Sequence, residues 1–277
     1  MKRFVSFFGE HSPVFDELNA RAAAYALERG FEYTWAPQKP FDKECVIALL
    51  RESDVGLIDV EPYDASIFTR IVPRCRLLIR FGVGFDKVNL SDATASGIAI
   101  ARTTGANCTG VAEMALTQML AARRQLMINR KTVNSGVWCK NVGGELIGAT
   151  VGIIGFGAIG QGLARLLSGF DCRILAYDPN PNIEAMQELH VTPCSLDELV
   201  EQSDAISIHV PYCLETHHMF DARMISRMQK TAVLVCTARG NIVDEEALFE
   251  ALQSGTIAVS YTHLDVYKRQ AYGGNHV

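Results

Sequence analysis

Several features that define other classes of protein are scarce in this sequence. It has no long run of lysine or arginine, and its net charge of -5 argues against nucleic acid or an anionic membrane as the main partner. No segment approaches the roughly 20 apolar residues of a membrane span. The apolar stretch after Met1 breaks at Gly9, too early for a secretion signal. These absences predict a soluble, cytoplasmic protein.

Paired cysteine motifs are also missing. Eight cysteines are scattered from Cys45 to Cys236 without a Cys-x-x-Cys pair, which favours reduced, mostly buried thiols over a disulfide framework or a zinc site. The adjacent His217 and His218 have no third ligand near them in the sequence, so no metal site is predicted.

The sequence does contain two arrays of short apolar runs separated by helical stretches. A chain of 277 residues exceeds a typical domain of about 100 to 200 residues. Runs this apolar predict an α/β fold of parallel sheets covered on both faces. The runs are Val5 to Phe8, Val55 to Val60, Leu77 to Phe81 and Ile98 to Ala101, then Val151 to Ile154, Ile174 to Tyr177, Ala205 to Val210 and Ala232 to Cys236.

Helix signals place the domain boundary. Ser12 is a predicted N-cap followed by Pro13 at the first helical position, and Gly30 ends that helix. Gly110 to Arg123 has helical spacing with few breakers. The boundary is therefore predicted just before it, with one domain over residues 1–103 and a second over 104–258.

The strongest chemical signal is a glycine-rich loop between an apolar run and a helical stretch. In Gly155-Phe156-Gly157-Ala158-Ile159-Gly160, the first glycine permits a tight turn and the second lets backbone N–H groups approach a pyrophosphate. The third lets helix and strand pack closely, and the helix start faces the anion. A glycine-rich turn without a ligand is the competing interpretation.

An acidic residue strengthens the first interpretation. Asp178 follows the next apolar run, about 20 residues beyond the loop, where a carboxylate can accept hydrogen bonds from the adenine ribose. It would repel a 2′-phosphate, which predicts NAD as the cofactor rather than NADP. Asp178 also precedes Pro179, so a role as a turn former is the alternative.

Two later segments fall where a doubly wound sheet has its ligand crevice. They are His209-Val210-Pro211 and Thr237-Ala238-Arg239-Gly240. The guanidinium of Arg239 suits a bidentate grip on a carboxylate, with a surface ion pair to Asp244 or Glu245 as the alternative. The histidine of the first segment is not predicted to be catalytic, because a strand-end histidine is more often a structural hydrogen bonder.

From Trp138 to Ala258 the sequence resembles the NAD-binding domain of the D-isomer-specific 2-hydroxyacid dehydrogenases, a family that includes phosphoglycerate dehydrogenase. The matching stretches are Glu145 to Gly157, Tyr177 to Pro179, Ser195 to Leu199, His209 to Pro211 and Thr237 to Asp244. The resemblance implies a Rossmann domain and a flavodoxin-like N-terminal substrate domain. It further implies that Arg239 binds the substrate carboxylate and that Thr216 touches the cofactor. The backbone of His209 to Pro211 and of Thr237 and Ala238 would line the nicotinamide half of the cofactor.

The N-terminal half resembles the same family. Arg80 to Val88 is similar to its substrate-domain loop, in which the backbone N–H groups of Gly82, Val83 and Gly84 would hold the substrate carboxylate; a simple turn is the alternative. Asn107 resembles the residue that begins the interdomain helix, where it would either cap the helix or face the cleft. Trp138 is expected to serve packing.

The activity implied is hydride transfer between NAD(H) and a 2-hydroxy or 2-keto acid such as 3-phosphoglycerate. The resemblance also implies a homodimer formed through the NAD-binding domains. A non-catalytic, NAD-sensing dimeric corepressor is the alternative, because the family fold serves that role too.

The C-terminal segment departs from the family. Members use a histidine acid or base with a glutamate partner, both beyond the region of Arg239. Here Val259 to Gln270 is instead similar to the in-frame translation of two joined transposon ends of the kind used in sequencing libraries. Residues 259–277 are therefore predicted to be an artefactual tail, with His263 and His276 poor candidates for the acid. The NAD-binding domain would be incomplete, and activity impaired on the order of a hundredfold to ten-thousandfold.

Overall fold

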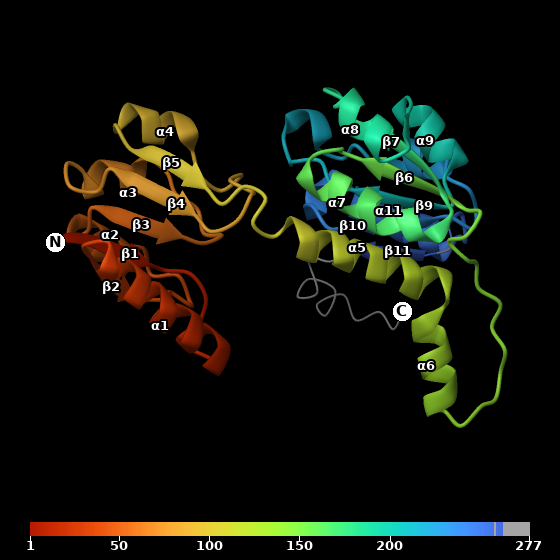
Figure 1. Ribbon diagram of the computed structural model, residues 1–277, viewed down its shortest axis with the longest axis horizontal. Coiled ribbons are helices and arrows are strands. Elements are labelled where there is room, and N and C mark those ends of the chain that lie inside the picture. Colours follow the sequence, from red (N-terminus) through yellow and green to blue (C-terminus); the bar gives the residue numbers. More distant parts are fainter. Residues whose placement is uncertain (258, 263–277) are drawn as a thin grey trace. The chain divides into compact units, whose positions relative to one another are not determined.

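The computed structural model describes residues 1–257 and 259–262 and divides the chain into two compact units (Figure 1). The first unit spans Met1–Ala106, so it ends three residues beyond the predicted boundary at residue 103, and the second begins at Asn107. Each unit is built on a parallel sheet with helices packed against it.

The first unit has a five-stranded sheet in the order β2-β1-β3-β4-β5, with every neighbouring pair parallel. This is the flavodoxin-like doubly wound order, as expected. Its strands are β1 (Lys2–Ser6), β2 (Phe31–Trp35), β3 (Val55–Ile58), β4 (Leu77–Arg80) and β5 (Ala99–Arg102). Its helices are α1 (Pro13–Glu28), α2 (Lys43–Arg51), α3 (Ala65–Ile71) and α4 (Leu90–Ala95).

The start and end signals of α1 act as predicted. The hydroxyl of Ser12 accepts the Phe15 N–H at 3.3 Å, and Gly30 has a φ of +79° just beyond the helix. The edge strand β2 was not predicted from the sequence. Its residues alternate between half-buried and exposed, because an edge strand with one wet face carries fewer apolar side chains than a central one.

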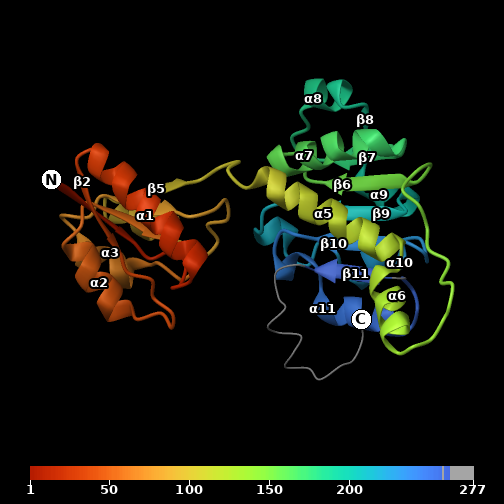
Figure 2. The same ribbon diagram turned by 60° about the horizontal axis from the view of Figure 1, so that its bottom comes forward.

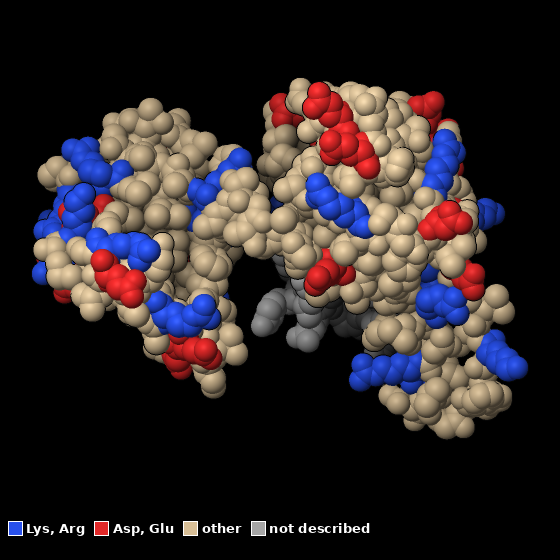
Figure 3. Space-filling model, in the orientation of Figure 1, with Lys and Arg blue, Asp and Glu red and all other residues tan. Residues whose placement is uncertain are grey.

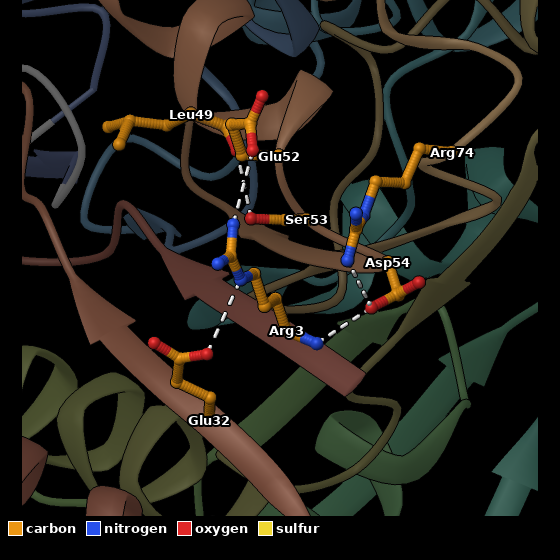
Figure 4. Close-up of polar contacts among 7 residues, drawn as sticks. All are labelled: Arg3, Glu32, Leu49, Glu52, Ser53, Asp54 and Arg74. Atoms are coloured by element: carbon orange, nitrogen blue, oxygen red, sulfur yellow. Dashed lines mark hydrogen bonds and ion pairs between the residues drawn. The ribbon is translucent and has the colours of Figure 1, made fainter. Parts of the chain in front are cut away.

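The amino ends of β1, β2 and β3 are joined by polar contacts around Arg3 (Figure 4). Its backbone N–H donates to Asp54 at 2.7 Å, and its guanidinium reaches Glu32 at 3.3 Å and Glu52 at 3.1 Å. Exposed pairs of this kind contribute only about 0 to 1 kcal/mol each. These contacts lie at the amino edge of the sheet. The predicted substrate loop lies at the opposite, carboxyl edge.

The second unit has a six-stranded sheet in the order β11-β10-β9-β6-β7-β8, again with all pairs parallel. This is the Rossmann strand order. Its strands are β6 (Thr150–Ile154), β7 (Arg173–Tyr177), β8 (Val191–Pro193), β9 (Ala205–Ile208), β10 (Val233–Cys236) and β11 (Val259–Thr262). Its α-helices are α5 (Cys108–Arg123), α6 (Leu126–Asn134), α7 (Ala158–Leu167), α8 (Ile183–Glu188), α9 (Leu196–Gln202), α10 (Ala222–Ser226) and α11 (Glu245–Gln253). Short 3₁₀ turns span Ser168–Phe170, Leu214–Thr216 and Gly240–Ile242.

Both faces of this sheet are buried. On β10, Val233 and Val235 belong to the core that includes α5 and α7, whereas Leu234 and Cys236 belong to the core that includes α9 and α11. Helices α5 and α7 lie side by side in both views (Figures 1 and 2). Alternate residues of one strand thus fill opposite cores, which explains why these strands are apolar throughout.

The sixth strand, β11, lies in the segment that was predicted to be an artefactual tail. β11 pairs along the whole of β10, with Val259 opposite Val233 and Thr262 opposite Cys236. The prediction that this sheet is incomplete from residue 259 onward does not hold for this strand. An edge strand is held by backbone hydrogen bonds, and valine, tyrosine and threonine favour extended structure. The origin of Val259 to Gln270 stays a prediction, and residues 263–277 lie outside the described part.

Two expectations about burial also change. Of the eight free cysteines only Cys75 and Cys236 are buried, while Cys139 and Cys213 are exposed. Trp138 does not pack against its own chain, because 88% of its surface is exposed.

None of the described helices is both long and apolar enough to span a membrane. On the face shown in Figure 3, basic and acidic side chains are interspersed rather than segregated.

Candidate functional site

The glycine loop connects β6 to α7, and its three glycines have three different environments. Gly155 has a φ of +91°, and a Cβ there would lie 2.9 Å from the carbonyl carbon of His209. A Cβ on Gly160 would lie 2.3 Å from the carbonyl oxygen of Gly155. A Cβ on Gly157 would meet nothing within 4 Å. Two glycines are thus required by packing, while the third faces open space.

The start of α7 is prepared for an anion. Gly157 is its N-cap residue and no side chain caps the helix, so the first N–H groups have no side-chain acceptor. Uncapped N–H groups and the helix dipole together attract negative charge. The open space at Gly157 admits a phosphate to within backbone distance. The residues of this loop therefore fit a pyrophosphate.

Asp178 follows β7 and lies beside this loop. One carboxylate oxygen accepts the backbone N–H of Phe156 at 2.7 Å, and the other accepts that of Asn180 at 2.9 Å. The second contact is the turn-forming role that the sequence left as an alternative. The contact with Phe156 ties the carboxylate to the glycine loop. From there the carboxylate could reach the diol of a ribose next to a pyrophosphate bound at the loop. A carboxylate oxygen has more than one lone-pair site, so both roles are compatible.

His209 and Thr237 lie at the carboxyl ends of β9 and β10. Nδ1 of His209 is 3.3 Å from the hydroxyl of Thr237. Its Nε2 is buried without a hydrogen-bond partner among the described residues. Burial lowers the pKa of the His209 imidazole to about 4. The ring is therefore neutral near pH 7, consistent with a structural rather than a proton-donating role.

Thr216 is fixed in the turn that follows β9. Its hydroxyl donates to the carbonyl of Pro211 at 2.7 Å and accepts the N–H of Cys213 at 2.9 Å. The backbone from Pro211 to Cys213 is thus held by the Thr216 hydroxyl. A cofactor stacked on this segment would meet a rigid surface.

Arg239 follows β10 in extended conformation and precedes a 3₁₀ turn. Its Nη1 donates to the carbonyl of Ala238 at 2.9 Å. A carboxylate oxygen of Asp244 lies 3.7 Å from Nδ1 of His218. The side chain is half-buried, a setting in which a bidentate contact to a carboxylate is stronger than at the surface.

The predicted substrate loop follows β4 in the first unit. Gly82 has a φ of +125°, and its N–H donates to the hydroxyl of Thr103 at 2.8 Å. Among the described residues, no hydrogen bond is recorded from the N–H groups of Val83 and Gly84. Two of the three predicted donors are thus available to a ligand, and Gly82 serves as the anchor.

Two further features of this loop were not predicted. The guanidinium of Arg80 lies against Gly82, where a Cβ would be 3.2 Å from Nη1, and it pairs with Asp59 at 3.8 Å. Thr103 follows β5 and holds Gly82 in place. The sequence offered one clue to both residues, which is their position at the carboxyl ends of apolar strands. The carboxyl ends of neighbouring parallel strands lie at the same edge of a sheet.

Asn107 precedes α5 without capping it. Its side chain makes no capping hydrogen bond to the helix, and the residue is exposed. Of the two roles left open by the sequence, capping is therefore not observed.

Comparisons with known proteins agree with this site. A family model described as D-isomer specific 2-hydroxyacid dehydrogenase, NAD binding domain, matches residues 116–276. The glyoxylate reductase of Korarchaeum cryptofilum is 35% identical over 253 residues, which cover 88% of this chain and 75% of that protein. The glyoxylate reductase of Thermococcus gammatolerans is 35% identical over 257 residues, covering 89% and 76%.

Solved structures are similar over nearly the whole chain. The NAD-dependent formate dehydrogenase from Staphylococcus aureus in complex with NAD matches with a TM-score of 0.77 and 32% identity, covering 100% of this chain and 84% of that chain. The pyruvate reductase of Chlamydomonas reinhardtii matches with a TM-score of 0.77 and 28% identity, covering 99% and 84%.

Proposed function

The chain belongs to the D-isomer-specific 2-hydroxyacid dehydrogenase family, and from this premise we propose that it reduces a small 2-keto acid, or oxidises the matching 2-hydroxy acid. NAD is the cofactor. The observation that carries the proposal is the glycine loop, in which Gly157 opens onto space while Gly155 and Gly160 are packed. A loop selected only as a turn would not need the open second glycine.

The residues that would hold the cofactor come from four strand ends. The loop from Gly155 to Gly160 would bind the pyrophosphate and Asp178 the adenine ribose. The segments His209-Val210-Pro211 and Thr237-Ala238, with Thr216 and Arg239, would line the nicotinamide half. When bound, the cofactor supplies or accepts the hydride. A carboxylate at Asp178 favours NAD over NADP, because it would repel a 2′-phosphate.

The substrate carboxylate has two proposed binding partners, one in each unit. The N–H groups of Val83 and Gly84 would donate to it from the first unit, and the guanidinium of Arg239 from the second. Asn107 is proposed as a further polar contact. Each set of donors suits the carboxylate of a 2-keto acid, and an acid held by its carboxylate leaves C2 as the reacting carbon, so that orientation contributes much of the rate.

The proton carrier is not assigned to a described residue. A histidine with a glutamate partner is expected beyond Arg239 in the sequence, and His263 and His276 lie outside the described residues. His209 is not proposed for this role, because its lowered pKa keeps it out of the imidazolium form that would donate a proton near pH 7.

We propose that two copies of the chain associate through their second units. Helix α6 and the segment that follows it expose large apolar side chains that a monomer would keep in water. They are Leu126, Ile128, Val133, Val137, Trp138, Val142 and Ile147. A second copy would cover them and give Trp138 the packing role expected from the sequence.

The test combines binding and turnover. The purified chain is titrated with NADH, then supplied with glyoxylate, pyruvate or 3-phosphohydroxypyruvate while NADH absorbance is followed. We expect NADH to bind and to be oxidised with glyoxylate, the substrate named for the relatives. Tight NADH binding with neither binding nor turnover of any acid would contradict a dehydrogenase and favour the NAD-sensing alternative.

A further inference from the structure

The predicted carboxylate loop is flanked by exposed aromatic rings. Phe81 precedes Gly82 and Phe85 follows Gly84, with 38% and 37% of their surfaces exposed. The ring of Phe8, just after β1, stacks on Phe81 with centroids 3.5 Å apart and planes 27° apart. Phe15 meets Phe8 edge to face at 5.3 Å. We call Phe8, Phe15 and Phe81 the aromatic ledge.

The ledge is held at the carboxyl edge of the first sheet. The N–H of Phe81 donates to the carbonyl of Ile58 at 2.9 Å, and the carbonyl of Phe8 accepts the indole N–H of Trp35 at 2.8 Å. Neighbouring Cα atoms are about 3.8 Å apart. The ledge begins at Phe81, which precedes the donors Val83 and Gly84 by two and three residues. In a 2-keto acid, C3 is two bonds from the carboxylate carbon. An acid held by its carboxylate therefore has its C3 substituent within reach of the ledge.

The charged groups around the loop include two acids, Asp59 and Glu61. Arg80 is buried and already paired with Asp59. Glu61 lies near that pair, and burial together with the charge of Asp59 raises the pKa of the Glu61 carboxyl. A phosphate or second carboxylate placed here would add negative charge beside these two acids.

The cation on the other side of the loop is engaged as well. Arg102 lies opposite Arg80, on the neighbouring strand β5. Its Nη1 donates to the carbonyl of Val83 at 3.2 Å, and its guanidinium lies 5.0 Å from the Phe85 ring centre. These contacts direct Arg102 toward the loop backbone rather than toward the ledge.

We propose that the aromatic ledge binds the C3 substituent of the substrate, and that the chain therefore selects 2-keto acids with an apolar substituent over those carrying a phosphate or a second carboxylate. This inference rests on the proposed dehydrogenase function. It makes Phe81 and Phe8 specificity-determining residues.

The experiment measures binding of a graded series of acids to the NADH-saturated chain by calorimetry. The series runs from glyoxylate through pyruvate and 4-methyl-2-oxopentanoate to phenylpyruvate, with 3-phosphohydroxypyruvate and oxaloacetate as the doubly charged members. We expect affinity to rise roughly fourfold for each carbon buried on the ledge. The doubly charged acids should bind more weakly than phenylpyruvate by about tenfold or more.

Variants separate specificity from general damage. Phe81→Ala should remove most of the gain along the series but change glyoxylate affinity by less than about threefold, and Phe8→Leu should give a smaller effect in the same direction. Phe249→Ala removes an aromatic side chain that is 55% exposed on α11 and serves as the matched control.

Four results would overturn the proposal. Equal affinity along the apolar series, or tighter binding of 3-phosphohydroxypyruvate, would exclude the ledge while leaving the dehydrogenase function standing, since glyoxylate would still bind. An equal loss for glyoxylate and phenylpyruvate in Phe81→Ala would mean that the ring only supports the loop. Failure of every acid to bind would reject the dehydrogenase function together with the ledge.

Discussion

The backbone N–H of Phe156 donates a 2.7 Å hydrogen bond to the carboxylate of Asp178, which joins the glycine loop to the end of the adjacent strand. The second carboxylate oxygen is held by the N–H of Asn180. The group proposed to bind the adenine ribose is therefore oriented before any ligand arrives. Preorganisation of this kind lowers the entropic cost of binding.

Asp178→Asn should weaken the preference for NADH over NADPH by about tenfold, or about 1.4 kcal/mol. The amide keeps an acceptor for Phe156 but removes the charge that would repel a 2′-phosphate. Fluorescence titration with each nucleotide measures the ratio. Glu188→Gln, an exposed carboxylate on α8, is the control and should leave it unchanged. An unaltered ratio in Asp178→Asn would reject the ribose assignment.

Two glycine variants in the same loop should behave oppositely. Gly157→Ala places a methyl group in open space at a φ of -75°, so the melting temperature should hardly change, while NADH affinity falls about tenfold or more. Gly160→Ala forces a Cβ against the carbonyl of Gly155 and should cost about 1 to 3 kcal/mol of stability. Thermal unfolding and NADH titration check both. Full NADH affinity in Gly157→Ala would argue against a pyrophosphate at this turn.

Arg239→Met should reduce the affinity for 2-keto acids by roughly 10-fold to 100-fold, because a charged hydrogen bond is worth about 1.5 to 3 kcal/mol. NADH affinity should fall far less. Calorimetric titration of glyoxylate into the NADH-saturated variant measures the effect. Arg223→Met, at an exposed position on α10, controls for loss of a positive charge. Equal losses in the two variants would point to long-range charge rather than to contact.

Thr103→Val should loosen the carboxylate loop, because the N–H of Gly82 loses its acceptor at 2.8 Å. We expect a stability loss of about 1 kcal/mol and a several-fold weaker affinity for 2-keto acids, with NADH affinity unchanged. Thr103→Ser keeps the hydroxyl and should restore acid binding. If the serine variant is as impaired as the valine variant, the hydroxyl is not what positions the loop.

The buried His209 should make stability depend on pH. Its folded-state pKa of about 4 lies below the unfolded value near 6.5, so the unfolded chain binds the proton more readily between these values. This contribution is complete above pH 6.5 and is lost as the pH falls toward 4, at up to about 1.4 kcal/mol per pH unit. Urea unfolding from pH 7 to 4.5 measures it, and His209→Gln should flatten the slope. His190→Asn is the control, because asparagine tolerates the positive φ of 54° at that exposed position.

Regular, strongly patterned elements could be predicted from the sequence alone. The apolar runs that became β6, β7, β9 and β10 were identified because both of their faces are buried, and the glycine spacing located the turn to α7. Strands β2 and β8 were missed, because these edge strands carry exposed residues and give no continuous apolar run. Strand β11 was missed because Val259 to Gln270 was interpreted as an artefactual segment.

The positions of the candidate site residues could likewise be predicted from local spacing. Each of these sites comes directly after a strand: the loop from Gly155 to Gly160, then Asp178, then Arg239. A parallel sheet brings such strand ends to one edge by its topology alone. For these residues the order along the chain determined the order in space.

Contacts between distant segments were decided only by the tertiary structure. Nothing in the sequence paired Gly82 with Thr103, Arg80 with Asp59, or Phe8 with Phe81, because each pair depends on strand order and register. The neutral state of His209 also follows from its burial between β9 and β10 and not from its neighbours in the chain. Local patterns therefore specified which cofactor is held, while packing across the sheets decided how the candidate site residues are positioned.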